Sequence, residues 1–158
     1  MAKTLAGSKF YVCATAQNSD LNAAAFAGLV WVEVGNVGKV GETGTNTNRV
    51  SYNELGTVVT QKAKGVTNAG DPTIECASNY NDAGQVIMRS IGVPTDKNSY
   101  AFKFEKDDAP SGYTNTIHYW RGDCSGPVRP NGEVESFDIE VFTLGLNQVE
   151  VTVNPTAL

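Results

Sequence analysis

Histidine is almost absent from this chain: His118 is the one histidine in 158 residues. The sequence therefore offers no paired histidines that could bind a metal ion. Cysteine is scarce as well, and Cys13, Cys76 and Cys124 are odd in number and far apart. A disulfide framework needs an even count and a zinc site needs Cys-x-x-Cys spacing, so neither is expected. We expect the three thiols to be buried and inert, because such cysteines behave as small hydrophobic residues.

Long apolar runs and clustered basic residues are also missing. No stretch of about 18 apolar residues occurs, and segment 1–20 has no unbroken apolar stretch, so we expect neither a membrane span nor a secretory signal. The formal charge is −5, and the densest basic cluster is only Lys62 and Lys64. Tight nucleic-acid binding is not expected, because phosphate contacts need clustered cations. With 41% hydrophobic residues, the 158 residues suit a single domain spanning 1–158.

Apolar residues recur at every second position along most of the chain. In segment 133–144, for example, Phe137, Ile139 and Val141 alternate with Asp138 and Glu140. One apolar and one polar face per strand is typical of antiparallel sheets with one side in water, so the sequence predicts a mainly β protein. The predicted strands lie within residues 9–14, 29–34, 57–65, 72–78, 100–106, 116–122, 133–144 and 148–153.

Between the second and third predicted strands lies a polar segment of 22 residues, Gly35 to Gly56. It is crowded with Gly, Asn and Thr and has few large apolar residues. Such a composition predicts a long loop or an extended, mobile hairpin. Structureless connections longer than about 12–15 residues are uncommon in compact domains and tend to be functional, so this segment is the first candidate for a functional role.

One segment has the periodicity of a helix. Residues 81–92 begin at a candidate N-cap, Asn81 or Asp82, and end at Gly92. On a helical wheel Val86, Ile87 and Ile91 share one face with Met88 beside them, while Gln85 and Arg89 point away. These three residues are predicted to pack on the core, because an apolar stripe normally covers a sheet. The alternative is that the stripe forms an interaction surface.

The stretch HYWRGDCSG, residues 118–126, contains the histidine, a tryptophan and an Arg-Gly-Asp tripeptide. A nucleophile–base pair between Cys124 and His118 would have to cross Gly122, and Asp123 is not identifiable as an orienting partner. The tripeptide is short enough to occur by chance. We therefore interpret the stretch as a strand that ends in a turn. With no phosphate-binding glycine loop elsewhere, the chain is expected not to be an enzyme.

The order of these elements resembles that of the major tail tube protein of long, non-contractile phage tails. The likeness covers nearly the whole chain and depends on element order together with the 22-residue polar segment. The segments that carry it are NDAGQVIMRSI for the helix, YAFKFEK for the strand after it, and GEVESFDIEVFTLG with VEVTV for the closing hairpin.

This resemblance implies an antiparallel β-sandwich or barrel-like subunit with one short α-helix (about 81–92) and a long polar hairpin loop (about 35–56). Such subunits close into hexameric rings, and the rings stack into a tube through which DNA passes without specific binding. The implied partners are further copies of the chain, the tape measure protein, and tail-tip and tail-terminator proteins. The implied location is the virion, after assembly in the host bacterial cytoplasm, with no cofactor, metal or membrane involved.

The resemblance also assigns roles by position. The long loop would reach a neighbouring subunit or the next ring, and polar strand faces are candidates for the lumen. The loop residues are Glu42, Thr45, Asn46, Asn48, Arg49, Tyr52 and Glu54, and the candidate lumen residues are Thr60, Lys62, Asp138 and Glu140.

Two other functions fit parts of the pattern. A monomeric β-sandwich that binds carbohydrate would use Trp31 or Trp120 as an exposed platform. A small hydrolase would use Asp138 and Glu140 as paired carboxylates, although a solvated polar face explains them better. Assembly separates these alternatives, because a tube subunit forms rings or filaments as its concentration rises and a binding module stays small.

Overall fold

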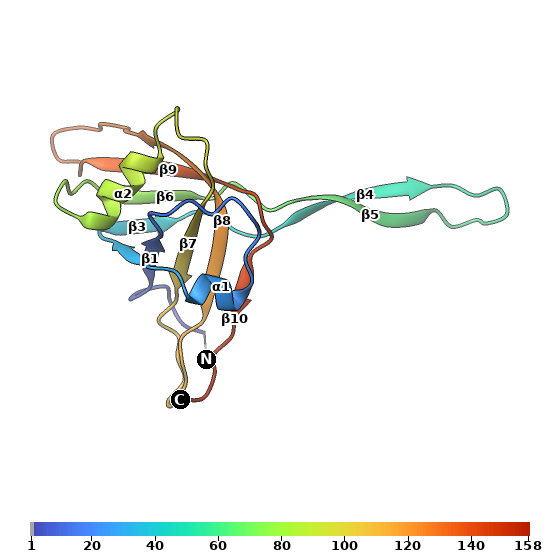
Figure 1. Ribbon diagram of the computed structural model, residues 1–158. Helices are drawn as coiled ribbons and strands as arrows, with labels where there is room; N and C mark the ends of the chain where they lie inside the picture. The colour runs from blue at the N-terminus through green and yellow to red at the C-terminus, as the bar shows by residue number, and fades with distance from the viewer. Residues whose placement is uncertain (1) are drawn as a thin grey trace.

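The computed structural model describes residues 2–158 and is mainly antiparallel β-sheet, as the alternating sequence pattern predicts (Figure 1). Seven strands form one sheet in the order β2 (Val32–Val34), β1 (Lys9–Val12), β7 (Tyr100–Glu105), β8 (Ile117–Val128), β9 (Ile139–Leu146), β6 (Thr73–Ala77) and β3 (Val37–Val40). An eighth strand, β10 (Val151–Val153), pairs with the start of β8, on the same side of β8 on which β9 pairs with the rest of that strand.

The sheet curls toward a barrel. Its two end strands, β2 and β3, are separated in sequence only by Gly35 and Asn36, so the two edges meet at that turn. Asn36 has φ = 60°, a left-handed conformation that asparagine tolerates better than most residues. The curled sheet thus has a concave side, which encloses the main core, and a convex side.

Both sides of the central strands are buried. On the concave side Phe10, Phe102 and Trp120 pack together with α2 (Ala83–Ile91). On the convex side α1 (Ala23–Ala27) brings Phe26 onto Tyr119, with ring centroids 5.0 Å apart. β7 is consequently buried on both faces. Within residues 2–158, neither helix has the length and hydrophobicity needed to cross a membrane.

The helix prediction was right in position and partly right in orientation, and α1 was not predicted. Of the three residues expected to pack on the core, Ile91 is buried and Ile87 is partly buried against the core, whereas Val86 is 49% exposed. Gln85 and Met88 also face the sheet. Gln85 is fully buried because its amide Nε2 donates to the carbonyls of Gly35 and Ala77, at 2.8 and 2.9 Å. A polar side chain can occupy a core position when it forms hydrogen bonds with backbone carbonyl groups that are buried beside it.

The predicted phase of the β9 segment was wrong by one residue. Alternate residues from Glu140 to Leu146 face the core, so that Phe142 and Leu144 are fully buried, and Ile139 and Val141 face the other way. Phe137 lies before the strand and is 82% exposed. The pattern misled because a buried glutamate occupies the first core position of the strand.

The prediction that HYWRGDCSG is the end of a strand was also wrong. β8 continues through Arg121, Gly122 and Asp123 to Val128, pairing with β7 up to Gly122 and with β9 from there on. Gly122 is required at this crossing, because a Cβ atom there would overlap the backbone of Gly145 and Leu146. The glycine that indicated a turn instead allows close backbone approach within the sheet.

The long polar hairpin exists, but it begins and ends later than predicted. β3 belongs to the main sheet, and the hairpin is formed by β4 (Asn46–Tyr52) and β5 (Gln61–Asn68), which make a separate two-stranded sheet. Most of the strand predicted at 57–65 is divided between the hairpin tip and β5. Figure 1 shows the hairpin projecting far from the rest of the molecule. We call residues 46–68 the arm.

Candidate assembly surface

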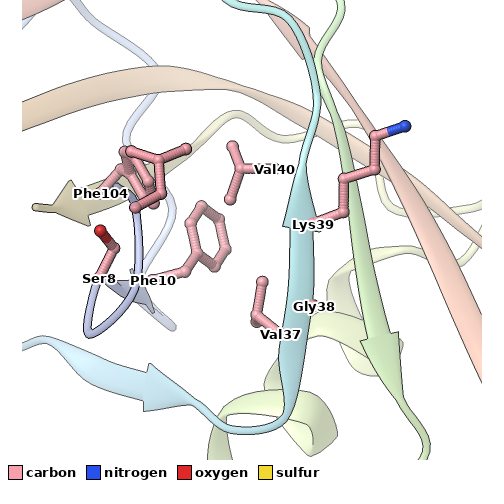
Figure 2. A pocket seen from close by; sticks show the side chains of 8 residues that line it. Ser8, Phe10, Val37, Gly38, Lys39, Val40 and Phe104 are labelled. Atoms are coloured by element: carbon pink, nitrogen blue, oxygen red, sulfur yellow. The ribbon is translucent and has the colours of Figure 1, made fainter. Parts of the chain in front are cut away.

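The described chain offers little that could perform covalent chemistry. One pocket, about 190 Å³ in volume, opens between the N-terminal segment and β3 (Figure 2). Phe10, Phe104, Val37 and Val40 make its walls apolar, and the amine of Lys39 points away from Phe10. A catalytic pocket needs convergent polar or titratable groups, and this one has only the Ser8 hydroxyl.

Two of the three thiols, Cys76 and Cys124, are buried and only weakly acidic. Burial raises the pKa of the Cys124 thiol to about 12 and that of Cys76 to about 11, so neither forms the reactive thiolate at neutral pH. His118 is held by Glu150, with Nδ1 and Oε1 2.6 Å apart, rather than by Cys124. Among residues 2–158, no three His, Cys, Asp or Glu side chains are grouped as a metal site would require.

The two carboxylates suggested for a hydrolase have different environments. Glu140 is fully buried and forms an ion pair with Arg89 of α2, at 2.9 Å, so it is not on a solvent-exposed face. Asp138 is exposed and lies in the connection between β8 and β9. The expectation that Glu140 lines a polar surface is therefore wrong, because the Glu140 carboxylate is paired with Arg89 in the interior of the subunit.

The two tryptophans do not provide an exposed binding platform. Trp120 is 1% exposed, and its Nε1 donates to Glu150 at 2.8 Å. Trp31 is partly buried, stacks near Tyr119 and donates to the carbonyl of Phe26 at 3.0 Å. This geometry disfavours the carbohydrate-binding alternative, since stacking on a sugar requires a free aromatic face.

The arm is the most exposed element of the molecule. Its strands pair with each other and, among the described residues, with no other strand. Asn46, Asn48, Arg49 and Tyr52 lie on β4, whereas Glu42 and Thr45 lie at the arm's base and Glu54 in its tip. Thr60 and Lys62, suggested for the lumen, also belong to the tip and to β5.

The arm exposes apolar side chains that a monomer would normally bury. Leu55 and Val58 at the tip are fully exposed, Tyr52 is 70% exposed and Val50 is 57% exposed. A two-stranded hairpin without further packing is only marginally stable in water. Exposed apolar groups on such an element are typical of a surface that another molecule covers.

A second exposed segment connects β8 to β9. Residues 129–138 are exposed throughout and carry Val134 and Phe137, which are 101% and 82% exposed. Glu133, Glu135 and Asp138 lie in the same segment, and the Ser136 N–H donates to the Glu133 carbonyl at 3.0 Å, which closes a turn around Val134 and Glu135. We call residues 129–138 the acidic loop.

Solved structures include a clear match to this arrangement. The fold is similar to that of a chain in the anti-feeding prophage baseplate. That cryo-EM structure is six-fold symmetrised; the TM-score is 0.58, and the match covers 98% of both chains at 10% sequence identity. No family model and no curated protein sequence matches the chain. At this identity the comparison establishes the fold, and the coverage shows that the likeness extends over the whole chain.

The sequence analysis identified part of the arm but not the acidic loop. The Gly/Asn/Thr composition of residues 35–56 indicated an extended hairpin, and the bounds were shifted because Val37–Val40 was too short a run to be recognised as a strand. The second half of the acidic loop was included in a strand predicted over 133–144, because Phe137, Ile139 and Val141 alternate with Asp138 and Glu140.

Proposed function

We propose that this chain is a structural subunit of a phage tail or phage-tail-like particle, which assembles with copies of itself into stacked hexameric rings that form a tube. The observation that carries the proposal is the arm, an element exposed on both faces that projects beyond the core of its own subunit. The similarity of the whole fold to a chain of a six-fold symmetrised prophage baseplate supports it.

The arm explains how assembly is controlled. In the free subunit its strands pair with no other strand among the described residues. In the proposed stack the arm lies against a neighbouring copy. Contacts that repeat head to tail around an axis close into a ring, and rings related by the same contacts along the axis form a tube. Ordering a marginally stable hairpin on binding costs free energy, and this cost keeps association between subunits weak until many contacts form together.

The tube is proposed as the path of DNA, with tape measure, tail-tip and tail-terminator proteins as its assembly partners and the virion as its location. Of the four candidates for the lumen, Glu140 is buried within the subunit, and Lys62 and Asp138 are better suited to a contact between copies, which leaves Thr60. A net charge of −5 fits a conduit that does not retain DNA, since attractive phosphate contacts would slow its passage.

Negative-stain electron microscopy over a concentration series tests this function. Rings or tubes with a central hole, and six-fold symmetry in end-on views, are the expected result. A protein that remains a small uniform particle at all concentrations, with tail-tip and tape measure partners added, would contradict the proposal. Sedimentation velocity on the same samples gives the mass of the smallest assembling unit.

A further inference from the structure

The arm has two chemically different faces. Residues directly opposite each other in an antiparallel pair share a face, and successive residues alternate. The strand register places Arg49 opposite Lys64 and Ser51 opposite Lys62, so three cations lie on one face. Val50, Tyr52, Gln61 and Ala63 share the other face. The arm is therefore a narrow ribbon with one cationic and one largely apolar side.

The cationic face is unfavourable in an isolated subunit. Like charges directly opposite each other destabilise a strand pair, and the arm places Arg49 and Lys64 in that relation. Within residues 2–158 the ion pairs join Arg89 and Arg129 to Glu140, Arg121 to Asp20, and His118 to Glu150, so the arm's cations take part in none of them. A partner that supplies carboxylates would remove this repulsion.

The rest of the chain carries the complementary charge. Residues 46–68 contain Arg49, Lys62 and Lys64 against a single carboxylate, Glu54, for a net charge of +2, so the chain's −5 is the sum of +2 on the arm and −7 elsewhere. A second copy of the same chain is thus a suitable partner for the cationic face, and no other molecule is needed to explain it.

The acidic loop is the part of the second copy that fits best. Its carboxylates, Glu133, Glu135 and Asp138, lie outside the ion pairs of the described chain, and its exposed Val134 and Phe137 can pack on an apolar surface. Three other carboxylates are already engaged: Asp20 with Arg121, Asp96 with the Tyr100 hydroxyl at 2.6 Å, and Asp108 with the Thr116 hydroxyl at 2.7 Å. Glu42, Asp71 and Asp107 are exposed as well, but they are far apart in the sequence, whereas the acidic loop carries three carboxylates within six residues.

The arm and the acidic loop lie at opposite ends of the sheet (Figure 1). The arm returns to the sheet just before Thr73, the first residue of β6, whereas the acidic loop enters β9 at Ile139, which pairs with Ala77 at the other end of β6. Displacing a copy along the direction of the arm therefore brings its acidic loop toward the arm of the first copy. That relation is heterologous and can repeat without limit along a stack.

From these observations we infer that the cationic face of the arm of one subunit docks on the acidic loop, residues 129–138, of a second copy. This inference rests on the proposed function and specifies which surfaces meet between stacked subunits. In this contact the three carboxylates of the acidic loop face Arg49, Lys62 and Lys64. Because the contact is partly electrostatic, salt weakens it.

Charge reversal of the full-length protein tests the contact. The arm variant carries R49E, K62E and K64E, and the loop variant carries E133K, E135K and D138K. The reversed arm still has like charges opposite one another, so the hairpin itself is altered little and complementarity with the acidic loop is what changes. The matched controls are K3E with K97E, and D71K with D107K, which alter exposed charges of the body.

Sedimentation velocity at low and moderate salt, together with electron microscopy, gives the readout. Each reversed variant alone should raise the concentration needed for association at least tenfold, and an equal mixture of the two should restore association, because each then meets an oppositely charged partner. The control variants should assemble like the wild type. Circular dichroism verifies that all variants fold.

Three outcomes would overturn the inference, and they differ in what they say of the proposed function. If the wild type forms tubes and the loop variant does so at the same concentration, the acidic loop is not the docking surface and the tube function stands. If the wild type stays monomeric under every condition, both the contact and the tube function are wrong. Loss of assembly in both variants without recovery in the mixture also contradicts pairing of these two surfaces.

Discussion

Arg89 of α2 donates from its Nε to both carboxylate oxygens of Glu140 on β9, at 3.2 and 2.9 Å, and Glu140 is fully buried. Burial alone would raise the pKa of Glu140, but hydrogen bonds from Arg89 and from the Ser78 hydroxyl outweigh it and lower the pKa. The ion pair therefore joins the helix to the sheet and explains how Glu140, which the sequence pattern places on a polar face, occupies a core position.

Replacing Arg89 with alanine leaves Glu140 buried without its partner. We expect the free energy of unfolding to fall by about 3–5 kcal/mol, since removing one member of a buried pair leaves an uncompensated charge. The double variant R89M/E140L should recover most of this loss. Urea unfolding at pH 7 measures both, with R49A on the exposed arm as the control expected within about 0.5 kcal/mol of wild type. A loss below about 1 kcal/mol in R89A would contradict the role of the pair.

Glu150 makes folding depend on pH. The hydrogen bond with His118 is the largest cause that lowers its pKa, burial opposes it, and the Trp120 N–H lowers it further, to about 2. Because this value lies below the ordinary 4.5, the stabilisation is present above about pH 4.5 and is lost as the pH falls toward 2. E150Q should therefore be less stable than wild type by roughly 1–2 kcal/mol at pH 7, after allowing for solvent screening.

The difference between E150Q and wild type should shrink steadily below pH 4.5. Urea unfolding at intervals between pH 2.5 and pH 7 measures it, and E133Q in the exposed acidic loop serves as the control. A difference that stays constant over this range would mean that Glu150 contributes packing rather than charge. The comparison between variants removes the effect of other carboxylates, including Glu140, that also take up protons at low pH.

The sequence predicted the class of the fold and the existence of the hairpin because both depend on local patterns. Alternation in segment 100–106 placed Phe102 and Phe104 correctly in the core. The predictions failed where a polar side chain is buried because it forms a hydrogen bond or ion pair with a residue distant in sequence, as Gln85 and Glu140 do. A helical wheel or an alternating pattern carries no information about such distant partners. The acidic loop was missed because exposed apolar residues such as Phe137 resemble core residues in a sequence.

The Arg-Gly-Asp tripeptide has a structural role that mutation can separate from an adhesive one. Gly122 lies where a side chain would overlap the Gly145 backbone, so G122A should lower stability by about 1–3 kcal/mol, the usual cost of overpacking. Asp123 is exposed and accepts a hydrogen bond from the Gly145 N–H, so D123A should change stability by less than about 1 kcal/mol. Thermal unfolding ranks the two, and a D123A effect as large as that of G122A would contradict this assignment.

Removing the arm should separate folding from assembly. Asn46 and Asn68 are paired at its base, so Thr47 to Thr67 can be replaced by an Asn-Gly turn that joins paired strand residues. The exposed arm makes no strand pairing with the body and supplies no residue of the main core cluster, so the body should retain its unfolding midpoint. The armless protein should remain monomeric at concentrations at which the wild type forms tubes, as sedimentation velocity and electron microscopy would show. Tubes formed by a folded armless protein would contradict both the role of the arm and its contact with the acidic loop, and would move the assembly surface to the body of the subunit.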